Sequence, residues 1–480
     1  MAFARILRSS ALMGGASVAT LGAGFLRSKV IAWVAGPAGV GLMGICSGFS
    51  GNVATFAGWG LGTAGVRAIA GAPEADHAAK IAAVRAFGRL LAWLGAALTL
   101  ALFWPVGLMT FGSTEYALDL LIGGLAAPLI IATSMWTAIL QSQGRLRQLA
   151  LTQVATALGG LMLGLPLIGW FGLHGIAPSL LLAAALPAAF TWWQARAVSP
   201  AMPAAAAAPE DILALVRLGG ALMVVGLLSQ LAAYAVRLLL IQRLGLEAAG
   251  NYQAALSIAG SLPGFVFAAM GTDFFPRVAA AADETEAKGL VEKQIQAGLL
   301  LALPLLALLL TMGRTCIHLL YKDDPQFDGA VLVLGWMIWG VYLRVVSWPM
   351  GFWLLARGSS WAVIVVEGVA SLVMGVLPWC FIGRYGLTGA GMAFFYGYLS
   401  YLGLMLLISR RRAGRWIDTF TLGVSAAAGG TLWLAAFVAE WLGGGWAGLA
   451  PVALVSLVCG WIYFRALGAE RSTEHPADRP

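Results

Sequence analysis

Charged residues are scarce in this chain. Only 10% of its 480 residues are Asp, Glu, Lys or Arg, whereas 60% are hydrophobic, and the mean hydropathy is +0.86. A membrane-crossing helix needs about 20 predominantly apolar residues, and runs of that kind fill nearly the whole chain. The composition therefore does not fit an ordinary soluble domain and predicts an all-α polytopic membrane protein.

Motifs that bind metals, nucleotides or cofactors are also absent from the sequence. Its four cysteines have no CxxC spacing, and its four histidines show no paired metal-binding spacing. There is no GxxxxGK[ST] loop, which argues against an ATP-driven pump, and no HExxH or GxSxG motif to indicate an enzyme. The 29 basic residues are too scattered for a nucleic-acid interface. We expect no metal, cofactor, nucleotide or nucleic acid, and no catalytic residue.

The apolar runs predict about 14 transmembrane helices. The expected ranges are 9–35, 40–66, 87–111, 116–140, 148–170, 174–194, 213–240, 248–275, 295–320, 330–355, 361–382, 388–409, 418–441 and 446–467. Of the 29 Lys and Arg residues, 21 then fall on the side of both termini, four on the other side and four within spans. Because basic residues concentrate on the cytoplasmic side, this bias predicts that the N- and C-termini are both cytoplasmic.

An internal repeat appears at an offset of about 210 residues. Gly41 matches Gly250 and Gly62 matches Gly271 at an offset of 209, whereas Gly144 matches Gly358 and Gly172 matches Gly386 at 214. Each copy holds six spans, so the copies are parallel repeats, and we expect them to form two lobes around a central cavity.

The repeat predicts the domain organisation. We expect an N-terminal six-helix lobe (1–196), a cytoplasmic linker (197–212), a C-terminal six-helix lobe (213–409), two additional transmembrane helices (410–467) and a disordered cytoplasmic tail (468–480). A short polar helix at the membrane surface is expected at 276–293.

Four cations lie within predicted spans, namely Arg27, Lys29, Arg237 and Arg344. A cation at the centre of a span costs about 2.5–3.5 kcal/mol on insertion scales and usually faces a protein-lined cavity. The offset of 209 places Arg237 between Arg27 and Lys29, at the same depth of the first helix in each copy. We interpret the four as ligands for an anionic substrate. Snorkelling of Arg27 and Lys29, or a buried pair between Arg344 and Glu367, is the structural alternative.

Other residues are candidates for the same cavity. Glu367 and its repeat counterpart Gln153 are polar positions that line a cavity or join helices, and Glu367 is the better candidate for a protonatable coupling group. Asp119 is a weaker candidate, better explained as an interfacial residue. Three deep tryptophans are candidates for stacking on glycan rings, although packing in the core explains them more simply: Trp59, Trp136 and Trp353.

The chain resembles a known family of transporters. The first helix, with Gly22, Ala23, Gly24 and Lys29, is followed by GPAGVGL and resembles the O-antigen and enterobacterial common antigen flippases of Wzx type. These belong to the polysaccharide transporter family, within the superfamily that also holds multidrug exporters and lipid II flippases. In the second half, NYQAALSIAG, LLARGSSWAVIVVEGV and RYGLTGAGMAFFYGY match the family pattern too.

The resemblance implies a flippase rather than an enzyme. Its substrate would be an undecaprenyl-diphosphate-linked oligosaccharide, moved from the cytoplasmic to the periplasmic leaflet of the bacterial inner membrane by alternating access. Lys29, Arg237 and Arg344 would clamp the diphosphate, Glu367 matches an acidic position, and Arg27 is additional. Besides this substrate and the bilayer, expected partners are a polysaccharide polymerase and chain-length proteins.

Two other functions compete with this one. An ion-coupled multidrug exporter of the same superfamily would need carboxylates in the cavity, where this chain has cations. A polytopic glycan polymerase or ligase typically carries a large periplasmic loop, whereas the longest outer loop here is only 321–329.

Overall fold

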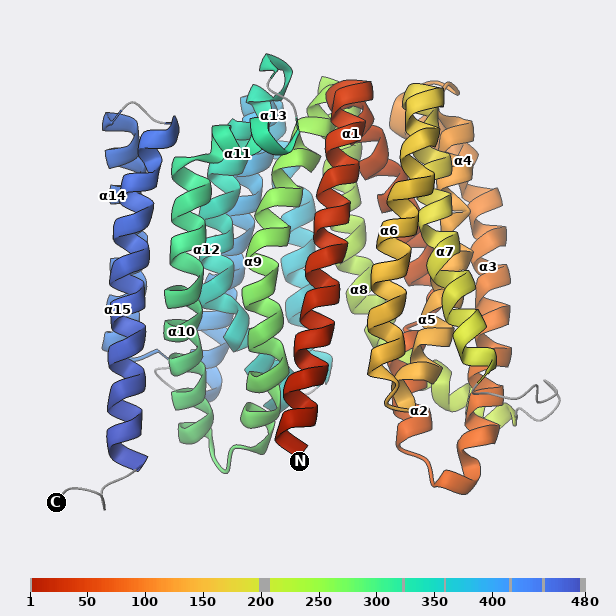
Figure 1. Ribbon diagram of the computed structural model, residues 1–480, viewed down its shortest axis with the longest axis horizontal. Helices are drawn as coiled ribbons and strands as arrows, with labels where there is room; N and C mark the ends of the chain where they lie inside the picture. The colour runs from red at the N-terminus through yellow and green to blue at the C-terminus, as the bar shows by residue number, and fades with distance from the viewer. Residues whose placement is uncertain are drawn as a thin grey trace. The chain divides into compact units, whose positions relative to one another are not determined.

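The computed structural model describes residues 2–197, 208–321, 324–357, 360–413, 417–442 and 445–474. All regular secondary structure within these ranges is helical (Figure 1). The longer helices are α1 (Ala2–Gly58), α2 (Leu61–Ala70), α3 (His77–Phe111), α4 (Ala117–Gly124), α5 (Ala126–Ser142), α6 (Leu146–Phe171), α7 (Ile176–Arg196), α8 (Pro209–Leu244), α9 (Leu246–Ala280), α10 (Glu284–Thr311), α11 (Gly313–Leu320), α12 (Asp328–Arg357), α13 (Ser360–Ala413), α14 (Thr419–Trp441) and α15 (Leu449–Glu474). The predicted all-α class is confirmed.

The number of membrane crossings follows from helix length. Nine stretches of the described residues are long and apolar enough to cross a membrane, and three of them hold 50 residues or more: Gly15–Ala70, Arg147–Arg196 and Ala362–Arg411. Fifty helical residues measure about 75 Å, more than twice the roughly 30 Å hydrocarbon core, so each of these three holds two crossings. With two crossings in each of these three and one in each of the other six, the nine stretches hold twelve crossings. Helices α9 and α15 bring the total to the 14 predicted spans.

The backbone turns confirm the internal repeat. Gly36 bends α1 with φ 60° and ψ −160°, and Gly245, 209 residues later, separates α8 from α9 with φ 88° and ψ 174°. Gly172 follows α6 with φ 58° and ψ −127°, and Gly386, 214 residues later, bends α13 with φ 58° and ψ −139°. These φ values favour glycine because a Cβ atom would clash there. The two offsets are those found in the sequence.

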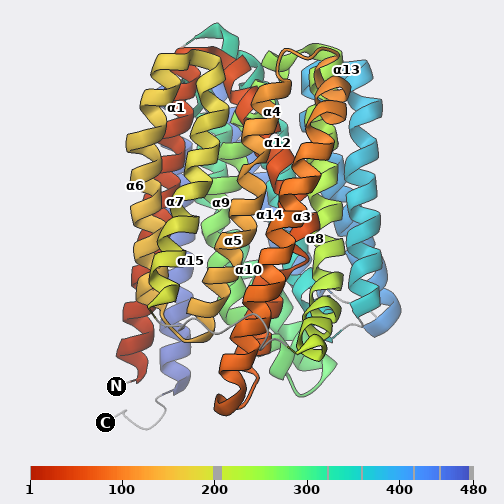
Figure 2. The ribbon, with the colours of Figure 1, turned by 90° about the vertical axis from the view of Figure 1, so that its right-hand side faces the viewer.

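Close backbone approaches repeat in the same way. A Cβ on Gly175 would lie 2.1 Å from the carbonyl oxygen of Leu167, and a Cβ on Gly389 would lie 2.2 Å from that of Phe381. Both pairs are related by the offset of 214. Because glycine has no Cβ atom, the following helix can fold back against the preceding one at each of these positions (α6 and α7 in Figure 2).

The chain forms two compact units. Unit 1 comprises residues 1–253 with 320–322, and unit 2 comprises residues 254–319 with 323–480. Unit 1 includes α8, although the predicted lobe boundary places this helix in the C-terminal lobe. Packing explains the difference, because the Trp59 indole donates to the Val216 carbonyl at 3.0 Å and Lys80 pairs with Asp211. The compact units thus divide the chain later than the predicted linker at 197–212.

The predicted surface helix at 276–293 is replaced by a tight turn. α9 continues to Ala280, and α10 begins at Glu284. The Asp283 carboxylate accepts a hydrogen bond from the Glu286 N–H at 2.7 Å, and the Glu286 carboxylate accepts one from the Ala282 N–H at 2.7 Å. This reciprocal capping satisfies free N–H groups at the start of α10, so the polar residues end one helix and begin the next.

Candidate functional site

Two neighbouring cations lie on the first arm of α1. Arg27 and Lys29 are half-buried and flank Ser28, which is 7% exposed. The Nε atom of Arg27 is shielded, and it has no hydrogen-bond partner within the described part of the chain. A buried donor of a charged group that lacks a hydrogen bond lowers the stability of the fold. This guanidinium is therefore suited to bind an anionic partner. At the offset of 209, Ser28 is the counterpart of Arg237.

Arg237 on α8 is held by neutral oxygen atoms. Its Nε donates to the side-chain oxygen of Gln253 at 2.9 Å, and its Nη1 donates to the Ala233 carbonyl, one turn earlier, at 3.0 Å. Neither acceptor carries a full charge, so both contacts orient the guanidinium without neutralising it. The predicted cation therefore keeps its charge inside unit 1.

Glycines of α1 provide the space for this arrangement. A Cβ on Gly44 would lie 2.9 Å from the Gln253 side-chain oxygen, and a Cβ on Gly48 would lie 3.8 Å from Arg237 Nη1. One turn away, a Cβ on Gly250 would lie 1.7 Å from the Pro37 carbonyl oxygen. The sequence interpretation missed Gln253 as a site residue. The signal was available, because Gln253 is the counterpart of Gly44 at the offset of 209, and the two are in contact.

In unit 2, Arg344 belongs to a mixed cluster. Its guanidinium carbon lies 5.8 Å from the ring centroid of Tyr398, within the range of cation–π attraction. Glu367 accepts a hydrogen bond from the Tyr401 hydroxyl at 3.0 Å and attracts Arg344 electrostatically. Arg344 from α12 and Glu367 from the first arm of α13 therefore belong to one cluster with Tyr398 and Tyr401, and a direct pair between them stays a prediction. The two tyrosines, three residues apart on the second arm of α13, were not predicted as site residues.

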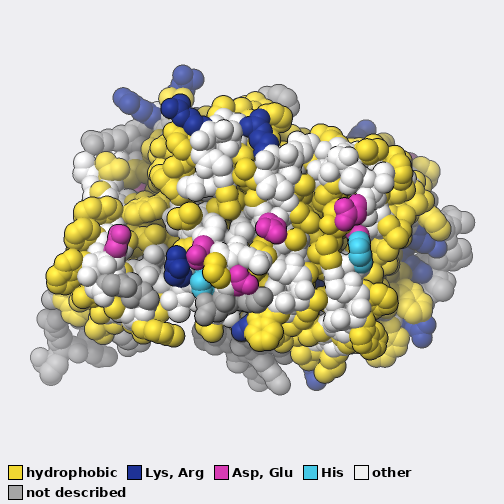
Figure 3. Space-filling model, turned by 90° about the horizontal axis from the view of Figure 1, so that it is seen from above, with side chains coloured by type: hydrophobic (Ala, Val, Ile, Leu, Met, Phe, Trp, Pro, Cys, Tyr) yellow, Lys and Arg dark blue, Asp and Glu magenta, His cyan; other side chains and the backbone are white. Residues whose placement is uncertain are grey.

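The remaining polar candidates lie elsewhere in unit 1. Asp119 on α4 is only 3% exposed, and its carboxylate pairs with Nδ1 of His174 at 2.8 Å. Its side chain is therefore buried and hydrogen-bonded to the His174 ring, and its place at the membrane interface stays a prediction. On the end of the molecule seen in Figure 3, acidic side chains lie next to histidines. Gln153 on α6 is half-buried, and its side-chain oxygen has no hydrogen-bond partner among the described residues.

Each tryptophan proposed for glycan stacking already contacts the protein. Trp59 donates to Val216, and Trp353, 3% exposed, donates to the Glu284 carboxylate at 3.0 Å. The Arg85 guanidinium lies 5.5 Å from the ring centroid of Trp136. Stacking of these rings on a glycan stays a prediction. Among the described residues, no group of three or more His, Cys, Asp or Glu side chains is placed to hold a metal ion.

Solved structures share this fold. A "Lipid II flippase MurJ, inward closed conformation" superposes with a TM-score of 0.74 at 14% identity, covering 96% of this chain and 99% of that one. An inward-facing "multidrug resistance MATE family transporter of the MOP superfamily" gives 0.62 at 17% identity, covering 82% and 98%. A MOP superfamily transporter from Pyrococcus furiosus, described as having a "reverse polarity of binding pocket", gives 0.54 at 16% identity, covering 84% and 95%.

The sequence comparisons give the family. A search of curated proteins finds no match. The family described as "Polysaccharide biosynthesis protein" matches residues 6–281, which is more than half of the chain. This multi-pass membrane protein, with the fold of the MOP superfamily transporters, therefore belongs to the polysaccharide biosynthesis protein family.

Proposed function

We propose that the protein is a flippase for a polyprenyl-diphosphate-linked oligosaccharide, and specifically an undecaprenyl-diphosphate-linked unit used for O-antigen, common antigen or exopolysaccharide. The observation that carries the proposal is Arg237. A guanidinium that is oriented by the Gln253 amide and a backbone carbonyl, inside an apolar helix bundle, retains a positive charge for a ligand. Diphosphate is the anionic group that a lipid-linked sugar provides, and arginine can bind phosphate oxygens in bidentate fashion.

The other cations take complementary roles in this proposal. Arg27 and Lys29 supply positive charge at the same depth of the first repeat, and Arg344 supplies it in the second. Glu367 partly offsets the positive charge of Arg344 and is the candidate for coupling to an ion. Gln153 is its polar counterpart in the first repeat. Asp119 acts through its pair with His174 rather than on substrate.

The mechanism is alternating access by two lobes around a shared cavity, without any catalytic step. The substrate enters from the cytoplasmic leaflet of a bacterial inner membrane and leaves on the periplasmic side, and both termini stay in the cytoplasm, as the bias of basic residues predicts. Polysaccharide polymerase and chain-length proteins are the partners that would consume the product.

The test is translocation in proteoliposomes. Purified protein is reconstituted with a radiolabelled polyprenyl-diphosphate oligosaccharide, and the label reaching the far leaflet is measured for wild type and for Arg237→Gln. Loss of a charge-assisted contact to phosphate predicts a rate at least about tenfold lower. Arg89→Gln is the matched control, because Arg89 also donates to the carbonyl one turn earlier, Arg85 at 3.3 Å, but is exposed.

Two results would overturn the proposal. Translocation by Arg237→Gln at the wild-type rate would show that Arg237 does not bind the diphosphate. Efflux of a small organic cation by the wild type, with no movement of the lipid-linked oligosaccharide, would identify a multidrug exporter instead.

A further inference from the structure

A polar pocket lies within unit 1, between the second arm of α1 and helices α2, α5 and α8. Its volume is about 340 Å³, near the lower end of the range for small-molecule sites. Four of its lining residues have polar side chains: Thr55, Thr63, Ser134 and Gln230. No charged residue is among the described residues that line it. Hydroxyl and amide groups both donate and accept hydrogen bonds, so this lining suits a neutral polar ligand rather than an ion.

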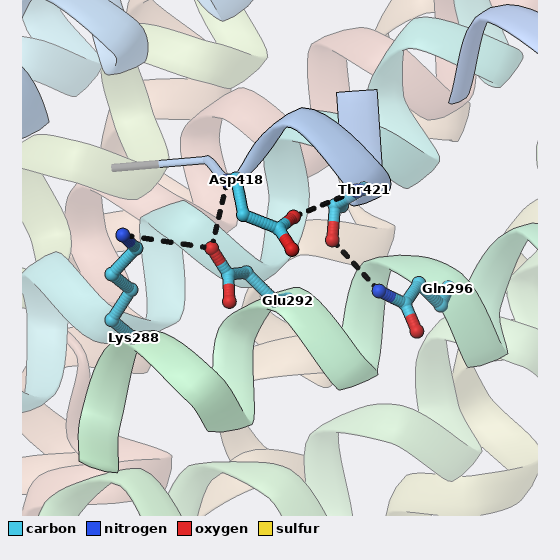
Figure 4. Close-up of polar contacts among 5 residues, drawn as sticks. All are labelled: Lys288, Glu292, Gln296, Asp418 and Thr421. Atoms are coloured by element: carbon cyan, nitrogen blue, oxygen red, sulfur yellow. Dashed lines mark hydrogen bonds and ion pairs between the residues drawn. The ribbon is translucent and has the colours of Figure 1, made fainter. Parts of the chain in front are cut away.

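The four polar side chains of the pocket have no hydrogen-bond partner within the described part of the chain. Comparable side chains elsewhere are paired. Thr133, next to Ser134 on α5, donates to the Leu129 carbonyl one turn earlier at 2.8 Å. In unit 2, the Gln296 amide donates to the Thr421 hydroxyl at 2.7 Å (Figure 4). The pocket residues therefore keep their donors and acceptors available for a ligand.

The pocket lies at the break between α1 and α2. Trp59 (φ 48°) and Gly60 (φ 64°) both have a left-handed backbone conformation there, which a tryptophan rarely adopts. The Trp59 indole is held by its hydrogen bond to the Val216 carbonyl. Gly58, Gly60 and Gly62 all line the pocket, so backbone atoms form part of its wall. Strained backbone persists where the surrounding structure holds it, and it clusters at ligand sites. The break is therefore a built feature of unit 1.

The pocket continues the contact between α1 and α8 that also surrounds Arg237. A Cβ on Gly51 would lie 3.2 Å from the Gln230 amide nitrogen, and a Cβ on Gly48 would lie 3.0 Å from the Tyr234 ring. Gln230 precedes Arg237 by seven residues. Seven residues are two helical turns, so both side chains lie on one face of α8, about 10 Å apart along its axis. A ligand bound at Arg237 needs to span only this distance to reach the pocket.

The direction from Arg237 to the pocket matches the layout of a lipid-linked sugar. Helix α8 begins at Pro209, after the linker that basic residues predict to be cytoplasmic, so Gln230 lies on the cytoplasmic side of Arg237. In a lipid-linked oligosaccharide the sugars follow directly on the diphosphate. Before translocation they lie on its cytoplasmic side, because the lipid tail stays in the membrane. A diphosphate at Arg237 therefore directs the sugars nearest to it toward the pocket.

We propose that this pocket binds a sugar ring next to the diphosphate, through hydrogen bonds between the hydroxyl groups of the sugar and the side chains of Thr55, Ser134 and Gln230. The inference rests on the proposed function and adds a determinant of specificity to it. A site built to hydrogen-bond a substrate group rejects an analogue that lacks this group, because its own polar atoms are then left unpaired. Arg237 and the pocket thus recognise different parts of one substrate.

Binding of two probes to the full-length protein in detergent tests the pocket. The probes are a radiolabelled polyprenyl-diphosphate oligosaccharide and the same polyprenyl diphosphate without sugar. The double variant Thr55→Val/Ser134→Ala removes two hydroxyl groups with little change of shape. We expect its Kd for the oligosaccharide to rise about tenfold, from two lost hydrogen bonds, and its Kd for polyprenyl diphosphate to stay at the wild-type value.

Two single variants serve as references. Thr133→Val is the matched control, because the Thr133 hydroxyl already has a partner and the residue does not line the pocket, although it lies beside Ser134. We expect it to bind both probes as the wild type does. Arg237→Gln should instead weaken the binding of both probes, since both carry the diphosphate.

Three results would contradict the inference and leave the proposed function standing. A wild-type Kd of the double variant for the oligosaccharide would show that the sugar binds elsewhere. An equal rise of the Kd for both probes would show that the two hydroxyl groups support the fold rather than recognise the sugar. An equal rise from Thr133→Val would show that the effect is not specific to the pocket. Binding of neither probe by the wild type would refute the proposed function itself, and the inference with it.

Discussion

The two compact units satisfy the arginines within their spans differently, although both arginines belong to the second sequence repeat. In unit 1, Arg237 donates to neutral oxygens of Gln253 and Ala233, whereas in unit 2, Arg344 lies beside the Glu367 carboxylate and the Tyr398 ring. The tryptophans follow the same pattern, since Trp59 donates to a carbonyl and Trp353 to a carboxylate. The contrast teaches that arginines within spans of one chain can be held by very different partners. Neutral oxygen atoms hold Arg237 in unit 1, whereas Arg344 in unit 2 has a carboxylate and an aromatic ring in its surroundings.

The largest effect is expected from Arg344→Leu. It leaves the Glu367 carboxylate without its cation, and we expect the free energy of unfolding to fall by about 2–4 kcal/mol, somewhat less than for a fully buried pair because Arg344 is half-buried. The double variant Arg344→Leu/Glu367→Leu should recover a large part of this loss. Thermal unfolding in detergent measures both. Strictly additive losses from the two single substitutions would show that the residues are not coupled, and the contrast between the units would then fail.

Glycine substitutions test the shared backbone. Gly175→Ala and Gly389→Ala each place a methyl group against a carbonyl oxygen, so each should lower the free energy of unfolding by about 1–3 kcal/mol, and by similar amounts. Gly169→Ala is the control, since a Cβ there meets nothing within 4 Å. A large loss in one repeat and none in the other, measured by the same unfolding assay, would contradict the structural equivalence of the two turns.

Tryptophan substitutions compare the two kinds of acceptor. Trp353→Phe removes a hydrogen bond to the Glu284 carboxylate, and we expect a loss of about 1.5–3 kcal/mol. Trp59→Phe removes one to the Val216 carbonyl, and we expect about 0.5–1.5 kcal/mol. Unfolding of both variants in one detergent gives the difference. If Trp59→Phe proved the more destabilising of the two, the acceptor charge would not govern these contacts.

The smallest effect on stability is expected from Arg237→Gln. Its partners are neutral, so no buried carboxylate is left behind. The substitution also removes the desolvation cost of a buried guanidinium, which offsets the two lost hydrogen bonds, so the free energy of unfolding should change by less than about 1 kcal/mol. The same variant should still lose translocation, which separates its proposed binding role from a structural one. A destabilisation as large as that of Arg344→Leu would show that Arg237 also has a charged partner.

Much of the fold could be predicted from the sequence because hydrophobic runs and glycine landmarks are local signals. The run lengths gave the 14 spans, and the offsets of 209 and 214 anticipated the matching turns at Gly36 and Gly245 and at Gly172 and Gly386. The partners of α8 could not be predicted, since contacts such as Trp59 with Val216 join residues 157 positions apart.

The sequence by itself determined that this chain crosses a membrane many times, repeats itself, and carries cations inside apolar helices. Hydropathy, periodicity and charge depend only on the residues and their order in the chain. Only the tertiary structure decided how each cation is satisfied. Gln253 reaches Arg237, and Tyr398 and Glu367 reach Arg344, through contacts between helices that no local pattern specifies.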